Sequence, residues 1–183
     1  MEKKIISASR RTDIPAFYSE WFLNRIKAGF VMVRNPTYRN QISRIDLNPE
    51  VVDCIVFWTK DPNDMFKNLD LLDQMKYNYY FQFTLTPYDK DIETNIPPKK
   101  EIIQSFLYLS DKIGKNKVIW RYDPIFLTDE ITTDFHIKHF ELLAKKLHKH
   151  TEKCIISFLD LYKGTLKNLK AIKPLDIDTD TIR

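Results

Sequence analysis

The chain has 183 residues, of which 43% are hydrophobic and 13% aromatic, so we expect one domain with a sizeable buried core. Its formal net charge of +4 is too small to demand a nucleic-acid or membrane partner. Three glycines and two distant cysteines, Cys54 and Cys154, exclude a glycine-rich phosphate loop, a zinc ribbon and a three-cysteine iron–sulfur loop within this chain.

Six short segments rich in β-branched and aromatic residues are predicted to be strands. In chain order they cover residues 4–9, 30–34, 54–60, 79–86, 117–122 and 154–159. Helical patterns lie between them, over residues 17–28, 63–76, 98–113 and 133–150. The polar stretch 37–50 fits neither pattern.

Strands that alternate with helices favour a parallel sheet with right-handed crossovers. The predicted class is therefore α/β, and the architecture is a partial (β/α) barrel (TIM-barrel-like) of about six parallel strands, because a closed eight-stranded barrel needs about 250 residues. We expect a single barrel-like domain over residues 1–175, incomplete at its C-terminal end, and a loose tail over 176–183. Self-association through the exposed edge of the last strand is also expected.

The sequence shows no apolar run near the roughly 18 residues of a membrane span, so no membrane partner is predicted. The N-terminus also lacks the apolar stretch of a signal peptide. Low cysteine use is typical of the reducing cytoplasm, which is the predicted location.

Polar residues follow five of the six predicted strands, and a proline comes soon after each group. The carboxyl ends of parallel strands meet at one edge, where βα folds place their active sites. The candidate ligand-binding residues are Ser9, Arg10, Arg11, Thr12, Asp13, Arg34, Asn35, Thr59, Lys60, Thr84, Thr86, Arg121 and Asp123.

Three arginines at these strand ends are the predicted clamps for an anionic small molecule, because a guanidinium binds carboxylate or phosphate in a fixed geometry. They are Arg10, Arg34 and Arg121. Asp13 and Asp123 would orient these cations, or a substrate amine or hydroxyl. A structural ion-pair network is the open alternative, and Asp13 fits a helix cap equally well. The sequence names no catalytic residue and no metal ligands, so enzymatic activity stays open.

Two further groups of residues are candidates for a functional role. Trp58, Trp120 and Tyr122 are expected in the core, with stacking on a planar ligand as the alternative. His136 and His139 share a helix face and are expected at the solvated surface.

Five stretches resemble, in the same order, a bacterial family called domain of unknown function 1848. They are ISASRRTDIPAFY (6–18), VRNP (33–36), FWTKDP (57–62), FTLTPY (83–88) and WRYDP (120–124). The resemblance implies a barrel-like fold whose full-length members carry a C-terminal cysteine cluster similar to that of radical S-adenosylmethionine enzymes. This chain lacks such a cluster, so no residue here is assigned to an iron–sulfur cluster or to S-adenosylmethionine, and no cofactor is expected within it.

The resemblance assigns no reaction. The leading hypothesis is therefore a barrel-like domain with a cationic strand-end site for an anionic small ligand. One alternative is a nucleic-acid-binding module, suggested by the lysines of the last predicted helix. These are Lys138, Lys145, Lys146, Lys149 and Lys153. The other alternative is a catalytically inactive fragment.

Overall fold

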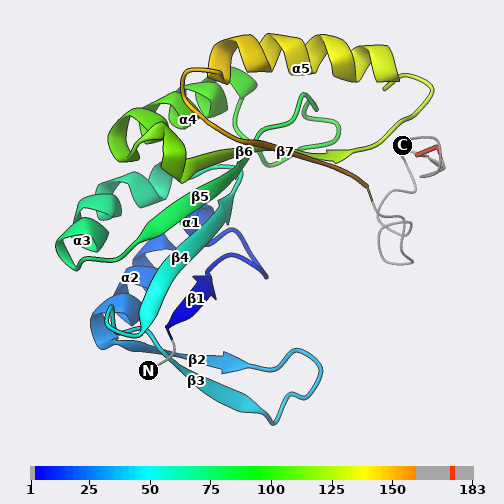
Figure 1. Cartoon of the computed structure of the whole chain (residues 1–183). Coiled ribbons are helices and arrows are strands. Elements are labelled where there is room, and N and C mark those ends of the chain that lie inside the picture. Colours follow the sequence, from blue (N-terminus) through cyan, green and yellow to red (C-terminus); the bar gives the residue numbers. More distant parts are fainter. Residues whose placement is uncertain (1–2, 160–173, 176–183) are drawn as a thin grey trace.

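The structure is a computed structural model that describes residues 3–159 and 174–175 (Figure 1). Within these residues, five parallel strands form one curved sheet in the order β1–β4–β5–β6–β7. The strands are β1 (Lys4–Ser7), β4 (Val52–Thr59), β5 (Tyr79–Thr84), β6 (Val118–Ile125) and β7 (Cys154–Phe158). The predicted α/β class and the partial barrel are confirmed. The predicted tail over 176–183 lies outside the described residues.

Helices connect the parallel strands and lie on one side of the sheet (Figure 1). They are α1 (Ile14–Phe17), α2 (Ser19–Ala28), α3 (Leu69–Gln74), α4 (Lys99–Ile113) and α5 (Thr133–Leu147), with 3-10 turns at Asn63–Asn68 and Lys115–Lys117. The predicted helix over 17–28 is divided at Tyr18, and α2 ends at Gly29, whose φ of 77° favours glycine. No helix in the described part of the chain is both long and apolar enough to span a lipid bilayer.

The second predicted strand is correct in its bounds but wrong in its partner. β2 (Phe30–Arg34) pairs antiparallel with β3 (Ile42–Asp46) in a separate two-stranded sheet. The side chain of Asn35 accepts hydrogen bonds from the N–H groups of Thr37 and Tyr38, and this turn reverses the chain. A parallel crossover needs a dozen or more residues, so this short connection produces a hairpin. The parallel sheet therefore has five described strands instead of six.

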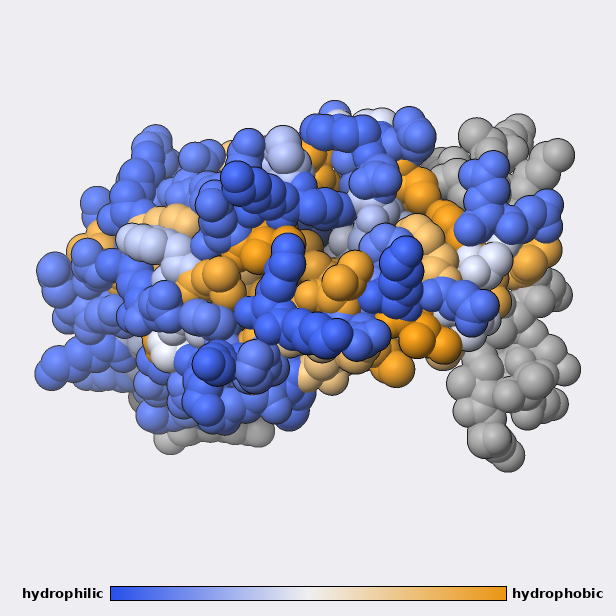
Figure 2. Space-filling view, turned by 90° about the horizontal axis from the view of Figure 1, so that it is seen from above, coloured by the Kyte–Doolittle hydropathy of each residue, from blue (hydrophilic) through white to orange (hydrophobic). Residues whose placement is uncertain are grey.

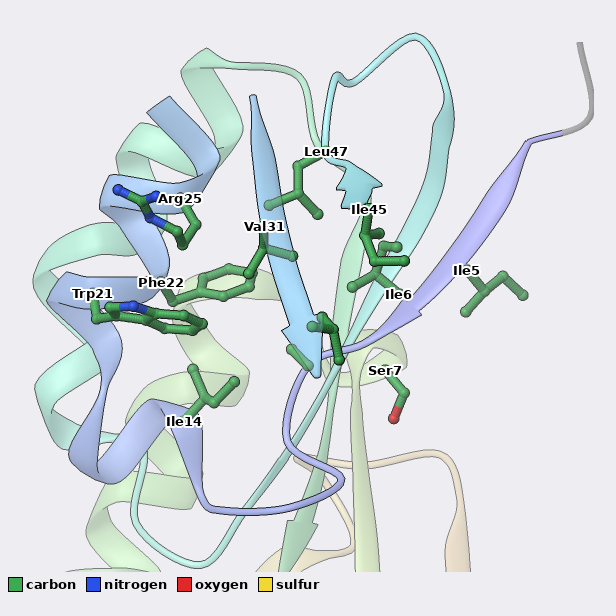
Figure 3. A pocket seen from close by; sticks show the side chains of 12 residues that line it. Ile5, Ile6, Ser7, Ile14, Trp21, Phe22, Arg25, Val31, Ile45 and Leu47 are labelled. Atoms are coloured by element: carbon green, nitrogen blue, oxygen red, sulfur yellow. The ribbon is translucent and has the colours of Figure 1, made fainter. Parts of the chain in front are cut away.

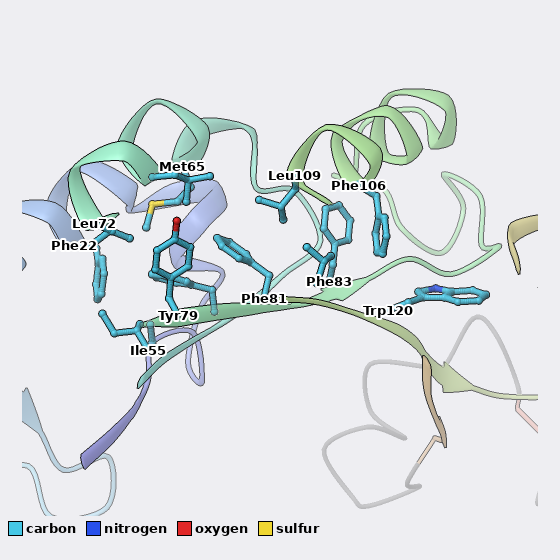
Figure 4. Close-up of a cluster of buried hydrophobic side chains, with 14 of the residues drawn as sticks. Phe22, Ile55, Met65, Leu72, Tyr79, Phe81, Phe83, Phe106, Leu109 and Trp120 are labelled. Atoms are coloured by element: carbon cyan, nitrogen blue, oxygen red, sulfur yellow. The ribbon is translucent and has the colours of Figure 1, made fainter. Parts of the chain in front are cut away.

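Aromatic side chains dominate the core between the sheet and its helices (Figure 4). The parallel register places Phe57 beside Phe81, with their ring centroids 4.9 Å apart. Phe83 lies 5.0 Å from Phe106 of α4. All four rings are fully buried. Truncation of such a ring to alanine typically costs about 3–5 kcal/mol, so this layer fixes the sheet against the helices.

The opposite face of the sheet carries no helix among the described elements (Figure 1). Trp58 lies on this face and is 37% exposed, whereas Trp120 and Tyr122 point into the helix-covered core and are 2% exposed. The predicted core position is therefore confirmed for Trp120 and Tyr122. β1 and β7 form the edges of the described sheet, and self-association through an edge stays a prediction.

His136 is buried, which contradicts its predicted place at the solvated surface. Its Nε2 lies 3.0 Å from the carbonyl oxygen of Phe126, and its Nδ1 lies 2.9 Å from the hydroxyl of Tyr122. A carbonyl only accepts, so Nε2 carries the proton and the tyrosine donates to Nδ1. Burial lowers the pKa of this histidine, which is held neutral as a link between α5 and β6.

We predict that this histidine makes the fold less stable in mild acid. Below its ordinary pKa of about 6.5, the unfolded chain takes up a proton that the folded chain resists. The free energy of unfolding should fall by up to about 1.4 kcal/mol for each pH unit below that value, until the lowered pKa of the folded state is reached. Urea unfolding of the wild type and of His136→Gln at pH 7.5 and 5.5 measures this term. The slope should shrink in His136→Gln and persist in the control His148→Gln; equal slopes in all three proteins would contradict the prediction.

Candidate functional site

The Asp13 carboxylate joins the loop after β1 to the end of β4. Its Oδ1 accepts from the N–H of Ala16 at 3.1 Å, which caps α1. Its Oδ2 accepts from the Thr59 hydroxyl at 3.0 Å and from the N–H of Lys60 at 2.7 Å. Burial raises the pKa of Asp13, and these three hydrogen bonds oppose that rise. The capping alternative is confirmed, and both oxygens are occupied by contacts within the fold.

A second carboxylate at the strand ends, Glu93, was missed by sequence reasoning. Lys60 and Lys99 both form ion pairs with it, and the Thr86 hydroxyl donates to its Oε1 at 2.9 Å. Burial would raise the pKa of Glu93, but the two lysines outweigh burial and hold that pKa below its usual value. Glu93 lies in the loop between β5 and α4, where no periodic pattern marks it. Lys60 is thereby neutralised within the protein.

Arg121 occupies a polar cluster on the sheet face that lacks helices. Its Nε and Nη2 contact Asp123 Oδ2, and its Nη1 donates to Gln82 Oε1 at 2.7 Å. The guanidinium carbon lies 4.6 Å from the centroid of the Trp58 ring. Ser157 of β7 donates to the other oxygen of Asp123 at 2.8 Å. These contacts join four neighbouring strands, β4 to β7, and match the ion-pair alternative at this position.

The arginines near the N-terminus lie at a different place. Arg10, Arg11, Thr12 and Arg34 line a pocket of about 530 Å³ between the loop after β1, helices α1 and α2, and strand β2. We call this pocket the arginine groove. Arg11 Nη1 donates to the carbonyl oxygen of Arg34 at 2.8 Å, which ties the loop to the hairpin. Arg10, Arg11 and Arg34 form no ion pair with any residue in the described part of the chain.

The remaining walls of the groove are apolar or aromatic except at Ser7. The lining residues beyond the polar ones above are Ser7, Ala8, Ile14, Tyr18, Trp21, Val31, Met32 and Val33. Tyr18 and Trp21 are about half exposed, at 50% and 47%. Trp21 is not among the candidate residues of the sequence analysis, so its place in the groove was missed.

Three other predicted site residues lie outside the groove. Ser9 is partly buried, and its Oγ has no hydrogen-bond partner among the described residues. Asn35 forms the hairpin turn described above. Thr84 pairs with Arg121 in the register of β5 and β6. The thirteen residues thus do not form one cluster: Arg34 belongs to the hairpin instead of the parallel sheet, and Arg121 does not line the groove. Within the described ranges, no group of three or more His, Cys, Asp or Glu residues is placed to hold a metal ion.

The fold and the groove together define an α/β protein with a half-barrel sheet and an arginine-lined pocket beside its first strand. The family described as Domain of unknown function (DUF1848) matches residues 5–183, and the chain belongs to this family. The resemblance seen in the five motifs is thereby confirmed over essentially the whole chain. No curated protein and no solved structure is significantly similar to it.

We predict that Asp13→Ala lowers the free energy of unfolding by about 2–4 kcal/mol, because it removes a helix cap and leaves the N–H of Lys60 without its charged acceptor. Asp61→Ala is the matched control. Among the described residues, the side chain of Asp61 hydrogen-bonds only to the nearby Asn63, so its loss should cost about 1 kcal/mol or less. Urea unfolding measures both changes. Equal costs for the two variants would contradict the role assigned to Asp13.

Proposed function

We propose that the protein binds a small anionic ligand in the arginine groove. The observation that carries the proposal is the convergence of Arg10, Arg11 and Arg34 on one pocket without an ion-pair partner in the described part of the chain. These residues come from two elements, a loop and a strand, that the hydrogen bond between Arg11 and Arg34 brings together. Guanidinium groups in such an arrangement suit phosphate or carboxylate.

The other predicted cations at the strand ends already have carboxylate partners, unlike the arginines of the groove, and this difference supports the choice of site. Lys60 and Arg121 already hold partly buried carboxylates as partners, so a ligand anion would have to displace Glu93 or Asp123 from them. Breaking a buried ion pair costs several kcal/mol. The arginines of the groove require no such exchange. The predicted clamp is therefore proposed here as Arg10, Arg11 and Arg34, without Arg121.

The charge balance along the chain favours the same place. Residues 8–44 hold seven basic and two acidic side chains, whereas the whole chain has a net charge of only +4. One of those two acids, Asp13, is half of the internal link described above. A local excess of positive charge in a concave site raises the concentration of anions there. The groove supplies binding and orientation, and the proposal assigns no reaction.

A nucleic-acid-binding surface on α5 is the second candidate. Its lysines are exposed, but Lys145 forms an ion pair with Glu141 four residues before it. Ile137 and Leu142 of the same helix are 61% and 48% exposed. Figure 2, seen from the side on which α5 lies in Figure 1, shows apolar atoms gathered among the hydrophilic ones. A phosphate backbone requires a continuous basic track, so these features favour the small anion.

Arg10→Gln and Arg34→Gln should each weaken the binding of pyrophosphate about tenfold, since a charge-assisted hydrogen bond contributes about 1.5 kcal/mol or more. Isothermal titration calorimetry measures the affinity. Arg44→Gln is the matched control, because Arg44 lies on the same hairpin, stacks on Phe30 at 4.4 Å and does not line the groove. Equal losses in all three variants would point to general charge and would overturn the proposed site.

The second candidate has its own test. We expect Lys146→Gln combined with Lys149→Gln to leave the affinity for a short single-stranded DNA unchanged, as measured by fluorescence anisotropy. A nucleic-acid surface on α5 would instead show a steep loss of affinity between about 50 and 200 mM salt. It would also show a smaller salt dependence in the double variant. Those two results together would favour the nucleic-acid function.

A further inference from the structure

We infer that the ligand of the arginine groove is an organic anion with a planar aromatic group, whose ring stacks on Trp21. The inference rests on the proposed function and adds the chemical class of the ligand. It is carried by the exposed indole of Trp21, by an apolar chamber that continues the groove, and by the position of the arginines at the other end.

Trp21 is far more exposed than the two residues that follow it on α2. Phe22 and Leu23, the next two residues, are 4% and 6% exposed, whereas the indole of Trp21 is 47% exposed. Figure 3 shows this indole on the α2 wall between the side chains of Arg25 and Ile14. Tyr18 lies three residues earlier, lines the groove and is likewise half exposed. The α2 side of the groove therefore presents two aromatic rings that the fold itself leaves partly uncovered.

The groove continues into a second chamber of about 270 Å³, shown in Figure 3. The two share six lining residues, which are Ser7, Ala8, Ile14, Trp21, Val31 and Val33. Deeper in the chamber, the walls are mainly apolar and include Phe22, Ile45 and Leu47, with the side chain of Arg25 as the charged exception. An inorganic anion bound at the arginines would not contact these apolar walls.

The groove thus becomes less cationic and more apolar along its length, since three arginines line the outer pocket and one, Arg25, lines the chamber. Arg10, Arg11 and Arg34 line only the outer pocket, and Val31 and Val33 line both parts. A molecule with an anionic group at one end and an apolar body at the other matches this gradient. The pocket, at about 530 Å³, has a volume typical of sites for small organic ligands, and the chamber extends it.

The aromatic nature of the apolar body follows from the shape of the two walls. On one side stands the indole of Trp21, and on the other stand the β-branched side chains of Val31 and Val33 on β2. A flat ring covers an indole face over its whole area, whereas a flexible chain covers less of it. A flexible chain also loses more conformational entropy when it binds. Stacking on an aromatic side chain strengthens binding roughly 5- to 150-fold.

Three probes with the same anionic group test the inference, namely inorganic phosphate, cyclohexyl phosphate and phenyl phosphate. Calorimetric titration should show that phenyl phosphate binds about tenfold or more tightly than inorganic phosphate, with cyclohexyl phosphate between them. Trp21→Leu should remove most of the advantage of phenyl phosphate and leave the affinity for inorganic phosphate unchanged, which also shows that the variant is folded. Trp58→Leu, on the sheet face away from the groove, is the control and should keep the advantage.

The outcomes separate the two proposals. If none of the three probes binds, the proposed function itself fails. If all three bind with equal affinity, the anion site stands and the aromatic ligand is rejected. If cyclohexyl phosphate binds as tightly as phenyl phosphate, or if Trp58→Leu removes the advantage as well as Trp21→Leu, stacking on Trp21 is rejected.

Discussion

The arrangement of the groove depends on the hydrogen bonds that the buried carboxylate of Asp13 accepts. It accepts three hydrogen bonds, one from the start of α1 and two from the end of β4. The residues that immediately precede it in the chain are Arg10, Arg11 and Thr12, so their backbone is fixed at one end by this carboxylate. At the other end they follow β1, which pairs with β4. A short loop held at both ends is a suitable support for a binding site.

Carboxylates also decide where positive charge is available. Glu93 forms ion pairs with both Lys60 and Lys99, and Asp123 forms one with Arg121, all at partly or fully buried positions. A buried cation without a partner is costly, so these pairs stabilise the ends of β4, β5 and β6. The groove is built differently, because its arginines stand at an exposed rim where water solvates them. The structural network and the candidate anion site therefore coexist, in separate parts of the same strand-end region.

Much of the fold could be predicted from apolar runs, because these five parallel strands and the helices between them have distinct periodicities. The direction of β2 could not be predicted, since the sequence FVMVR suits a parallel and an antiparallel strand equally well. The turn at Asn35 decides between them. Within the candidate site, the arginines stood out by residue type. Trp21 did not, because its spacing from Phe22 and Ile26 suggests a core position, whereas in the structure it is about half exposed on the wall of the groove.

The width of the groove depends on how the hairpin is held against the rest of the molecule. At the inner end, Leu47 is buried in the core, its N–H donates to Gly29 at 2.8 Å, and its carbonyl accepts from Tyr77. At the mouth, the hydrogen bond from Arg11 to Arg34 is exposed. The inner end is thus fixed by apolar burial, and the mouth is fixed by a weaker solvated contact. A ligand that bridges the arginines would add its contacts where the hairpin is held least firmly, so binding would stabilise the hairpin against α2.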